Sequence, residues 1–406
     1  MIRVLVIGDA ANYMQMISKC VKKSKIHVIN FPRHGASKLT YDNNVEYFES
    51  NRISKCIKKI NEIKKDFDVC VAIFGGTTVA YLSGLNYMTH YVGGDIEFPM
   101  WEKNPGELYL KQPIQKHNFL QRWFYKNVQE NAIACSAFGE AYVNKLKKYR
   151  KDAIRINTVP KDVDFFNQIV IPLDRKKEKF VIFSPSRCCY YKKLDIFWKA
   201  IPLCKSDFEV LQVEWFDERT SEESSKNREL FKNRPSNVKS IPLIKRDEMI
   251  NYYNFADAVI GDSRLSTSFG FIEAEAALLK KPVIKYVHPN AKFILDEKPA
   301  DIPFFPKSLD PVEFANFIDK LVQSKDFRDK TIEEQYNFMN KASDPNKVGE
   351  EWDKIFENIH QKHKNIQKDS GTTILFRNIY FQIVNQLYFR KVKKLASLIL
   401  KRIFKL

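Results

Sequence analysis

The part of this chain that most constrains its fold is the run ADAVIGDSRLSTSFGFIEAEAALLKKPVIKYV at positions 256–287. Two short apolar runs, Val259–Ile260 and Val283–Val287, flank an alanine-rich segment, Phe269–Lys281, whose composition favours a helix. Pro282 ends this helix because its ring prevents a further helical hydrogen bond. The order of strand, loop, helix and strand predicts a βαβ unit, and therefore an α/β fold with parallel strands.

The loop before this helix has the composition of an anion-binding turn. One residue of Ser266–Ser268 can cap the helix, which leaves the other N–H groups of its first turn free to face a phosphate. Gly270 lets a ligand approach the backbone closely. In the second turn, the carboxylate of Glu275 can accept hydrogen bonds from sugar hydroxyls. Glu273 projects from a different face, and we expect it to be solvated.

This stretch resembles the donor-site motif of retaining GT-B glycosyltransferases of the glycogen-synthase-like superfamily, also called glycosyltransferase family 4. The motif reads E-x-F-G-x-x-x-x-E-A, with a glycine shortly before P-V-I. Thr267 replaces the first glutamate and Lys280 replaces the glycine. The resemblance implies that Glu275 binds the nucleotide ribose. It makes Thr267 a catalytic candidate by position, although the glutamate's role near the transferred sugar does not carry over to a threonine. The donor-binding candidates here are Ser268, Phe269, Gly270, Phe271 and Glu275.

A second candidate site follows the predicted strand Phe180–Ser184. Arg187 and Lys192 lie five residues apart on the next loop, where a planar guanidinium and a mobile ammonium suit a diphosphate. The alternative is that Lys192 and its neighbour Lys193 are solvated surface charges. The run Ser186–Asp195 is similar to the family's S-R-x-x-x-x-K-G-x-D. That resemblance implies that Arg187 and Lys192 bind the diphosphate and stabilise its departure during catalysis.

The first half of the chain begins like a Rossmann fold. Ile2–Ile7 is predicted to be a buried strand, and Gly8 turns it into a helix. In such sheets the ligand cleft lies beyond the carboxyl ends of the strands, so Gly8 and Asp95 are candidate donor-binding residues. A tight turn explains Gly8 equally well, and a helix cap explains Asp95. His90 lies inside a predicted strand, and we expect it to be a core residue.

Two further expectations concern the ligands. Family resemblance places the nucleotide base against the backbone near Leu243 and Ile244. The proline-containing segment 97–117, which includes Trp101, is predicted to be an irregular loop and a candidate wall of the acceptor site.

A chain of 406 residues is too long for one ordinary α/β core. Pro160–Phe166 resembles the family's P-N-G-V-D-x-x-x-F linker, so we place a domain boundary near Gln168. We expect an N-terminal Rossmann-like, acceptor-side domain at 1–168 and a C-terminal Rossmann-like donor domain at 169–345. A helix crossing back to the first domain should occupy 346–365. The predicted fold is thus GT-B, with the two domains facing each other across a cleft and a basic amphipathic helical tail at 366–406.

The tail carries much of the chain's formal charge of +18, because Asp369 alone opposes eleven lysines and arginines from Lys362 onward. Apolar residues recur at helical spacing from Ile374, and no uncharged run is long enough to cross a bilayer. This pattern favours a helix lying on an anionic membrane surface through residues 374–406. The alternative is a helix docked on the enzyme or in a dimer. Nucleic acid is not expected, since no recognised motif is present.

The seven cysteines lack metal-type spacing, and the histidines are few and scattered, so we predict a reducing compartment and no metal site. No signal peptide precedes the first strand, which favours a cytoplasmic protein peripherally associated with the membrane. The resemblance implies a retaining glycosyltransferase that uses a UDP- or GDP-sugar as donor substrate, with no permanently bound cofactor. The acceptor would be a glycan or a lipid-linked molecule. Two alternatives stay open: a catalytically degenerate GT-B protein that binds a nucleotide sugar or a partner, and a GT-B sugar-nucleotide epimerase.

Overall fold

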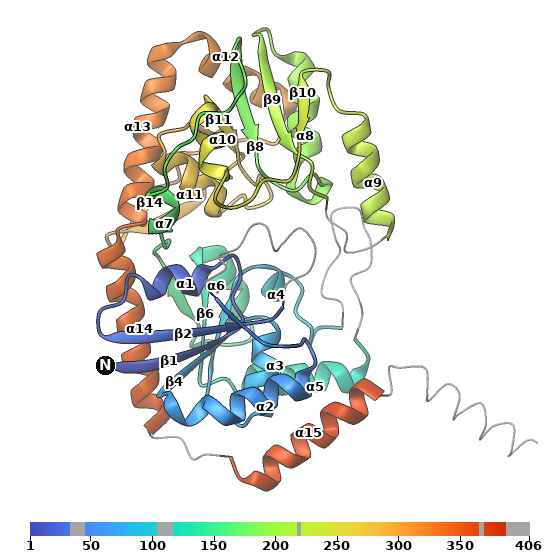
Figure 1. The fold of residues 1–406 in the computed structure, drawn as a ribbon, viewed down its shortest axis with the longest axis vertical. Helices are drawn as coiled ribbons and strands as arrows, with labels where there is room; N and C mark the ends of the chain where they lie inside the picture. The colour runs from blue at the N-terminus through green and yellow to red at the C-terminus, as the bar shows by residue number, and fades with distance from the viewer. Residues whose placement is uncertain (33–44, 104–116, 217–220, 365–368, 387–406) are drawn as a thin grey trace, which may run out of the picture.

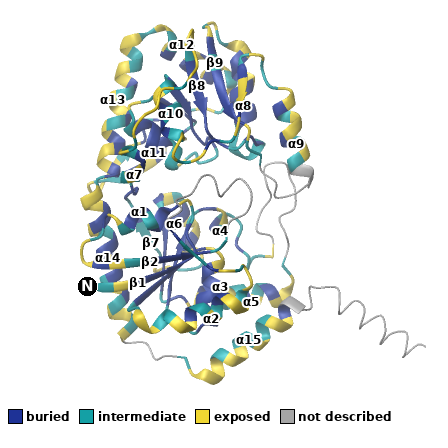
Figure 2. Ribbon diagram, viewed as in Figure 1, coloured by how far each residue is buried: buried dark blue, intermediate teal, exposed yellow. Residues whose placement is uncertain are grey.

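The protein folds into two α/β domains that face each other (Figure 1), as a computed structural model describes it for residues 1–32, 45–103, 117–216, 221–364 and 369–386. Each domain is built on a parallel sheet, one of seven strands and one of five. Figure 2 shows that buried residues are concentrated in these sheets and that exposed residues lie on the outer helices. The predicted fold class, two Rossmann-like domains of the GT-B type, is confirmed.

The first sheet has the strand order β3-β2-β1-β4-β5-β6-β7. Its central strands are short apolar runs because helices cover both faces. The strands are β1 (Ile2–Ile7), β2 (Ser24–Asn30), β3 (Glu46–Tyr47), β4 (Val69–Ala72), β5 (Met88–Tyr91), β6 (Ala134–Phe138) and β7 (Ile154–Ile156). The helices are α1 (Tyr13–Ser18), α2 (Ile53–Ile63), α3 (Gly75–Leu82), α4 (Gly94–Glu97), α5 (Phe119–Glu130) and α6 (Gly139–Lys147), with a 3-10 turn at Lys64–Asp66.

The second sheet has the order β10-β9-β8-β11-β12 and contains the predicted βαβ unit as β11, α11 and β12. Its strands are β8 (Phe180–Ser184), β9 (Phe208–Val213), β10 (Val238–Ile241), β11 (Ala258–Ile260) and β12 (Val283–Ile284). A separate hairpin pairs β13 (Lys292–Leu295) with β14 (Lys298–Asp301). The helices are α7 (Val163–Phe166), α8 (Leu194–Ala200), α9 (Ser221–Lys232), α10 (Met249–Phe255), α11 (Phe271–Leu278), α12 (Pro311–Gln323) and α13 (Lys325–Ala342), with 3-10 turns at Tyr190–Lys192 and Ile201–Leu203.

The helix α14 (Pro345–Lys364) returns to the first domain and packs against its sheet. Trp352 and Phe356 are fully buried in that core, as predicted for packing residues. The carboxylate of Asp353 accepts hydrogen bonds from the backbone N–H groups of Lys22 and Lys23, each at 2.9 Å. These two hydrogen bonds hold α14 on the first domain, to which the chain has returned.

The first part of the predicted tail is the helix α15 (Gly371–Gln386), which docks beside α3 and α5 (Figure 1). The amide of Asn378 donates to Leu82 O at 2.9 Å, and the hydroxyl of Tyr380 donates to Leu120 O at 3.0 Å. Arg377 lies 4.2 Å from the centre of the Tyr81 ring and pairs with Asp369, so this cation anchors the helix. The alternative in which the tail helix docks on the enzyme therefore applies to the inner face of α15. Residues 387–406 lie outside the described part of the chain.

Several elements differ from the sequence-based predictions. The helices α5 and α13 and the hairpin of β13 and β14 were not predicted, and α1 ends at Ser18 rather than near Lys22. The helix predicted at Phe269–Lys281 is shorter, since α11 ends at Leu278. None of the described helices combines the length and the apolar character that a membrane span requires.

Lys280 explains how α11 ends. It replaces the glycine of the family motif and has a left-handed φ of 55°, the conformation that glycine adopts readily after a helix. Its ammonium also lies 5.1 Å from the centre of the Tyr336 ring. A direct test therefore compares two substitutions that both remove this contact.

We expect Lys280→Gly to be more stable than Lys280→Ala by about 1 kcal/mol, because only alanine keeps the steric penalty of a positive φ. The matched control is Lys330, in the interior of α13, where alanine should be more stable than glycine by about 1 kcal/mol. Urea denaturation of the four variants measures both differences. The same rank order at both positions would contradict the proposed role of the left-handed backbone.

Candidate functional site

The loop between β11 and α11 is held by a buried glutamate. Glu273 is fully buried, and its carboxylate accepts the N–H of Asp262 at 2.5 Å and the N–H of Gly270 at 2.8 Å. The expectation that Glu273 is solvated is therefore wrong, and so is the expectation that a residue of Ser266–Ser268 caps the helix. At the third position of α11, Glu273 can reach back to the helix start, as in a capping box.

A buried lysine binds backbone carbonyl groups of the same loop. Lys285, just after β12, is fully buried and donates from Nζ to Asp262 O at 2.9 Å and to Leu265 O at 2.6 Å. Burial lowers its pKa to about 8. Sequence reasoning missed it because a lysine between apolar strand residues gives no sign of the loop carbonyls that it binds.

Asp262 connects this loop to the predicted diphosphate cations. Its carboxylate lies 3.5 Å from Nζ of Lys192 and 3.4 Å from Nη2 of Arg264. Burial alone would raise the pKa of Asp262, but Lys192, Arg264 and Lys285 hold it below its usual value. The structure thus gathers three cations around Asp262, while Glu97 pairs with Arg264 and Glu273 lies near Lys285. Of the three, Lys192 is the cation that also lines the small cavity at Arg187.

Arg187 and Lys192 line one small cavity together with Gly261 and Ser263. The guanidinium of Arg187 lies 5.6 Å from the centre of the Trp215 ring, and Nζ of Lys192 lies 3.3 Å from the Ser186 hydroxyl. The strands before the two loops, β8 and β11, are parallel neighbours. The Arg187 loop and the β11 loop therefore leave the same edge of the sheet.

Glu275 has a different environment. It is buried, and Oε1 pairs with Nη2 of Arg246 at 2.6 Å, while Oε2 accepts the Tyr253 hydroxyl at 3.2 Å. The same guanidinium binds Asp162 at 2.9 Å and lies 4.0 Å from the centre of the Phe165 ring. Glu275 lines neither the Arg187 cavity nor the cleft cavity described next. Its carboxylate joins α10 and α11 to the interdomain linker.

A second cavity, of about 220 Å³, lies between the domains. From the second domain it is lined by Ser268, Phe269, Gly270 and Phe271, all predicted donor-binding residues, and by Arg264. Phe269 is also part of an aromatic cluster, with its ring 5.0 Å from that of Phe293. The predicted Thr267 is exposed, and Ile244 is buried in the core of the second domain.

The domains contact each other through a polar cluster that sequence reasoning missed. Arg264 donates from Nη1 to Oε2 of Glu97 at 3.0 Å and to the Tyr191 hydroxyl at 2.9 Å. The hydroxyls of Tyr191 and Tyr142 donate to the two oxygens of Glu97 at 2.5 and 3.0 Å. No local pattern in the sequence links Arg264 to a glutamate on α4.

The N-terminal candidates have structural roles. Gly8 has a φ of 82°, and a Cβ there would lie 2.5 Å from Ile73 O, which supports the tight-turn explanation. Asp95 is the second residue of α4 rather than its N-cap, and it accepts the N–H groups of Val92 and Gly93 in the preceding turn at 3.2 and 3.1 Å. Burial raises its pKa to about 7.

His90 is a core residue, as predicted. It is fully buried, its Nδ1 lies 2.8 Å from the Ser136 hydroxyl, and burial lowers its pKa to about 3. Its imidazole stacks on the Tyr13 ring and reaches the cleft cavity in the neutral form. Among the described residues, no group of three or more histidine, cysteine, aspartate or glutamate side chains could hold a metal ion.

Residues 166–338 match the protein family described as Glycosyl transferases group 1. This region contains the Arg187 loop, the β11 loop and the whole βαβ unit. No match was found among curated proteins.

Solved structures share the two-domain fold. HepE from Anabaena, solved with UDP-glucose, superposes with a TM-score of 0.61 at 12% identity, covering 88% of this chain and 100% of HepE. A glycosyltransferase from Rickettsia africae gives 0.59 at 17% identity, covering 88% and 98% of the two chains. Sucrose-phosphate synthase from Thermosynechococcus elongatus gives 0.60 at 12% identity, covering 88% and 99%. At these identities the similarity shows the fold.

The Arg246–Glu275 pair makes a testable contribution to stability. Arg246→Met leaves a buried carboxylate without its cation, so we expect a loss of about 3 kcal/mol. Adding Glu275→Gln should recover part of the lost stability, because position 275 then carries no buried charge that lacks its cation. The control is Arg175→Met, whose pair with Glu209 is more exposed and should contribute less than about 1 kcal/mol. Equal losses at Arg246 and Arg175 in urea denaturation would contradict this role.

Proposed function

We propose that this protein is a retaining glycosyltransferase that takes its sugar from a UDP-sugar. The observation that carries the proposal is the cation cluster around Asp262, which lies inside the region that matches group 1 glycosyltransferases. The solved structure of HepE contains UDP-glucose, which favours UDP over GDP as the nucleotide to test first.

The proposed donor site joins the Arg187 cavity to the interdomain cleft. Arg187 and Lys192 bind the diphosphate and neutralise the charge that develops on it as the sugar leaves. Arg264 contributes a further positive charge near the proposed diphosphate position. Neutralisation of the diphosphate is thus assigned to these side chains rather than to a divalent metal.

In the proposed reaction, the bond between the anomeric carbon and the diphosphate oxygen breaks. The acceptor hydroxyl oxygen then bonds to the same face of that carbon, and its proton passes to the departing diphosphate. His90 takes no part as a base, because its Nδ1 is bound to Ser136 and it is enclosed in the core. Thr267 lies where the family has a glutamate, but it is exposed and lines neither cavity, so it has no chemical role in the proposed reaction.

Glu275 is proposed to bind the ribose, as the family resemblance implies. Its carboxylate has about four acceptor positions, and Arg246 and Tyr253 each take one. Arg246 holds the carboxylate in one orientation, which reduces the entropy lost on binding.

A competing function is nucleotide-sugar binding without turnover. Two observations favour it: Thr267 replaces the motif glutamate, and Glu275 is already paired with Arg246. Both functions need the same diphosphate site, so they differ only in chemistry after binding.

UDP binding tests the shared site. We expect UDP to raise the melting temperature of the wild type, and Arg187→Ala and Lys192→Ala each to weaken UDP binding about tenfold, since each removes a charged hydrogen bond. Arg175→Ala, a surface arginine paired with Glu209, is the control and should bind UDP like the wild type. Isothermal titration measures the affinities.

No binding of UDP or GDP, or equal affinities in all variants, would contradict the donor site. If UDP-sugars bind but UDP is never released in the presence of candidate acceptors, the binding protein is supported instead. A rearranged sugar without any acceptor would indicate an epimerase.

We further propose that the enzyme lies on the anionic cytoplasmic face of a membrane, where a glycan or lipid-linked acceptor is presented. Exposed apolar residues from α5 and α15 form one surface, which we call the α5–α15 surface: Phe119, Leu120, Trp123, Leu375, Phe376, Ile379 and Ile383. The two helices lie side by side, and the rings of Trp123 and Tyr380 are 4.9 Å apart. The sequence beyond this surface is rich in lysine and arginine, which anionic headgroups attract.

Vesicle flotation tests the membrane proposal. Phe376→Asp with Ile379→Asp places two charges on the α5–α15 surface, and we expect more than tenfold weaker binding to vesicles of phosphatidylcholine and phosphatidylglycerol at 3:1. Leu203→Asp, an equally accessible apolar position in the second domain, is the control. Unchanged flotation of the double variant would remove the membrane role of this surface.

A further inference from the structure

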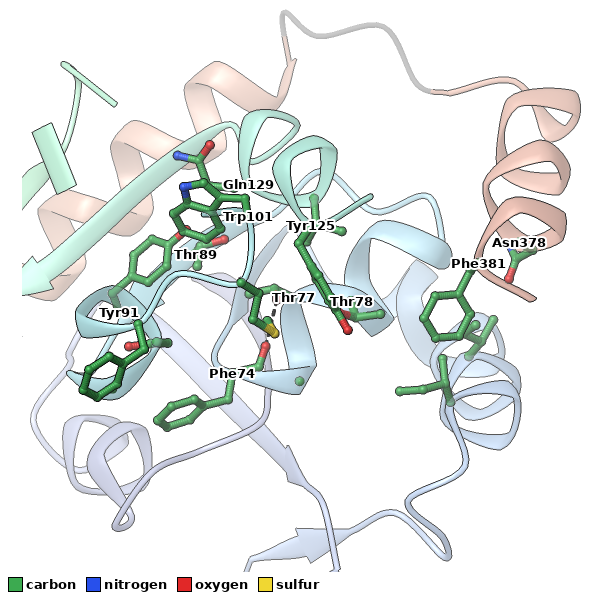
Figure 3. Close-up of a pocket in the computed structure, with 18 of the residues that line it drawn as sticks. Phe74, Thr77, Thr78, Thr89, Tyr91, Trp101, Tyr125, Gln129, Asn378 and Phe381 are labelled. Carbon is green, nitrogen blue, oxygen red and sulfur yellow. Dashed lines mark hydrogen bonds between the residues drawn. The ribbon is translucent and has the colours of Figure 1, made fainter. Parts of the chain in front are cut away.

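The largest cavity described lies in the first domain, away from the cation cluster. It has a volume of about 1050 Å³ and is enclosed by α2, α3, α5 and α15 and by the segment after α4 (Figure 3). Phe74 and Gly94 line it, and they follow the carboxyl ends of β4 and β5, the edge where doubly wound sheets bind ligands. Its volume suits an organic ligand rather than a few waters.

One end of this cavity presents polar groups without partners. Within the described residues, Thr89 Oγ1, Gln129 Nε2 and Trp101 Nε1 are buried and make no hydrogen bond. Thr89 is 2% exposed and Gln129 is 5% exposed, and Figure 3 shows both beside Trp101. A buried donor without an acceptor is unfavourable, so three at one place point to a ligand that supplies oxygen atoms.

The rest of the wall is mostly apolar, with Ile53, Ile57, Phe74, Tyr125 and Phe381 among the residues that line it. Ser54, Thr78, Asn378 and Gln382 add polar groups, and among the described residues Arg52 and Asp95 are the charged ones that line it. Figure 3 shows Phe381 at the end away from Gln129, with Tyr125 between them. A free glycan would leave many hydroxyls unpaired on this wall, whereas an apolar chain fits it.

The cavity adjoins two other features of the molecule, one at each end. Its α15 wall, which includes Phe381 and Asn378, is the inner face of the helix whose outer face belongs to the α5–α15 surface. At the polar end, α4 carries Asp95 into the cavity and Glu97 into the cross-domain cluster. Phe98 lines the cavity, and its ring centroid lies 6.5 Å from that of Tyr191. The cavity therefore lies between the α5–α15 surface and the contact between the domains.

We propose that this cavity binds an amphipathic acceptor, a lipid with a hydroxyl-bearing head group and one apolar chain. Thr89, Gln129 and Trp101 donate hydrogen bonds to the head-group oxygens, and a hydroxyl of the head group donates to Asp95. The chain extends along Tyr125 to Phe381. This inference rests on the proposed glycosyltransferase function and names the acceptor class for the same active site.

Alkyl β-glucosides of six to nine carbons, used below their micellar concentrations, are the probe. Binding to the full chain is followed by Trp fluorescence and by thermal shift. We expect affinity to rise about fourfold for each added methylene, as for full burial of an apolar chain. Glucose should not bind detectably. An affinity that is independent of chain length would overturn the proposal.

Isosteric variants test the polar end. Thr89→Val and Gln129→Leu remove donors without partners, so we expect each to raise the melting temperature of the free protein while weakening octyl glucoside binding about tenfold. Thr331→Val is the control, because its buried hydroxyl already donates to Phe327 O at 2.8 Å. It should lower the melting temperature and leave octyl glucoside binding unchanged.

Unchanged glucoside binding in both Thr89→Val and Gln129→Leu would overturn the assigned head-group site. Binding of UDP is measured on the same variants and should equal that of the wild type. If the wild type binds UDP but no alkyl glucoside, the acceptor inference alone is contradicted. Glucoside binding without any UDP binding would contradict the proposed donor function instead.

Discussion

Two buried charges of opposite sign hold the loop on which the rest of the site depends. Glu273 binds the N–H groups at both ends of this loop, at Asp262 and Gly270, and Lys285 binds the carbonyls of Asp262 and Leu265. Backbone donors and acceptors in a tight buried loop need such partners, since water cannot reach them. With the backbone fixed in this way, Asp262 faces Lys192, and Arg264 faces the other domain.

The first domain uses α4 for two purposes. This short helix places Asp95 in the large cavity and Glu97 against Arg264 and Tyr191. A ligand or a substitution in the large cavity therefore lies close to the contact between the domains. The same helix links the proposed acceptor cavity to the contact with the domain that carries the donor site, although the two sites are built from different sheets.

The sequence predicted most of the framework because strands and turns depend on local patterns. Phe180–Ser184 is apolar throughout, as a strand covered on both faces must be, and it is β8. Asn118 and Gln121 form a capping box before α5, a local pattern that could have predicted this missed helix. The role of Glu273 was not predictable from the assumed helix start, because two residues of error in that start change which group a side chain can reach.

The site itself was only partly predictable. The Arg187 loop and the β11 loop follow neighbouring parallel strands, so their proximity could be expected from topology. The pair of Arg246 and Glu275 and the contact of Arg264 with Glu97 join residues distant in sequence, and no single-sequence pattern encodes them. One side of the cavity is closed by α15, whose packing on α3 and α5 depends on side-chain fit rather than periodicity.

The chain passes between the domains twice, through the linker after β7 and at the junction of α13 and α14, and the two passages are joined to each other. The N–H of Val159 in the first donates to the carbonyl of Ala342 in the second at 3.0 Å. Both passages lie along one side of the molecule (Figure 1). Two joined passages on one side oppose sliding of one domain past the other, and a rotation about them would widen the gap most on the opposite side.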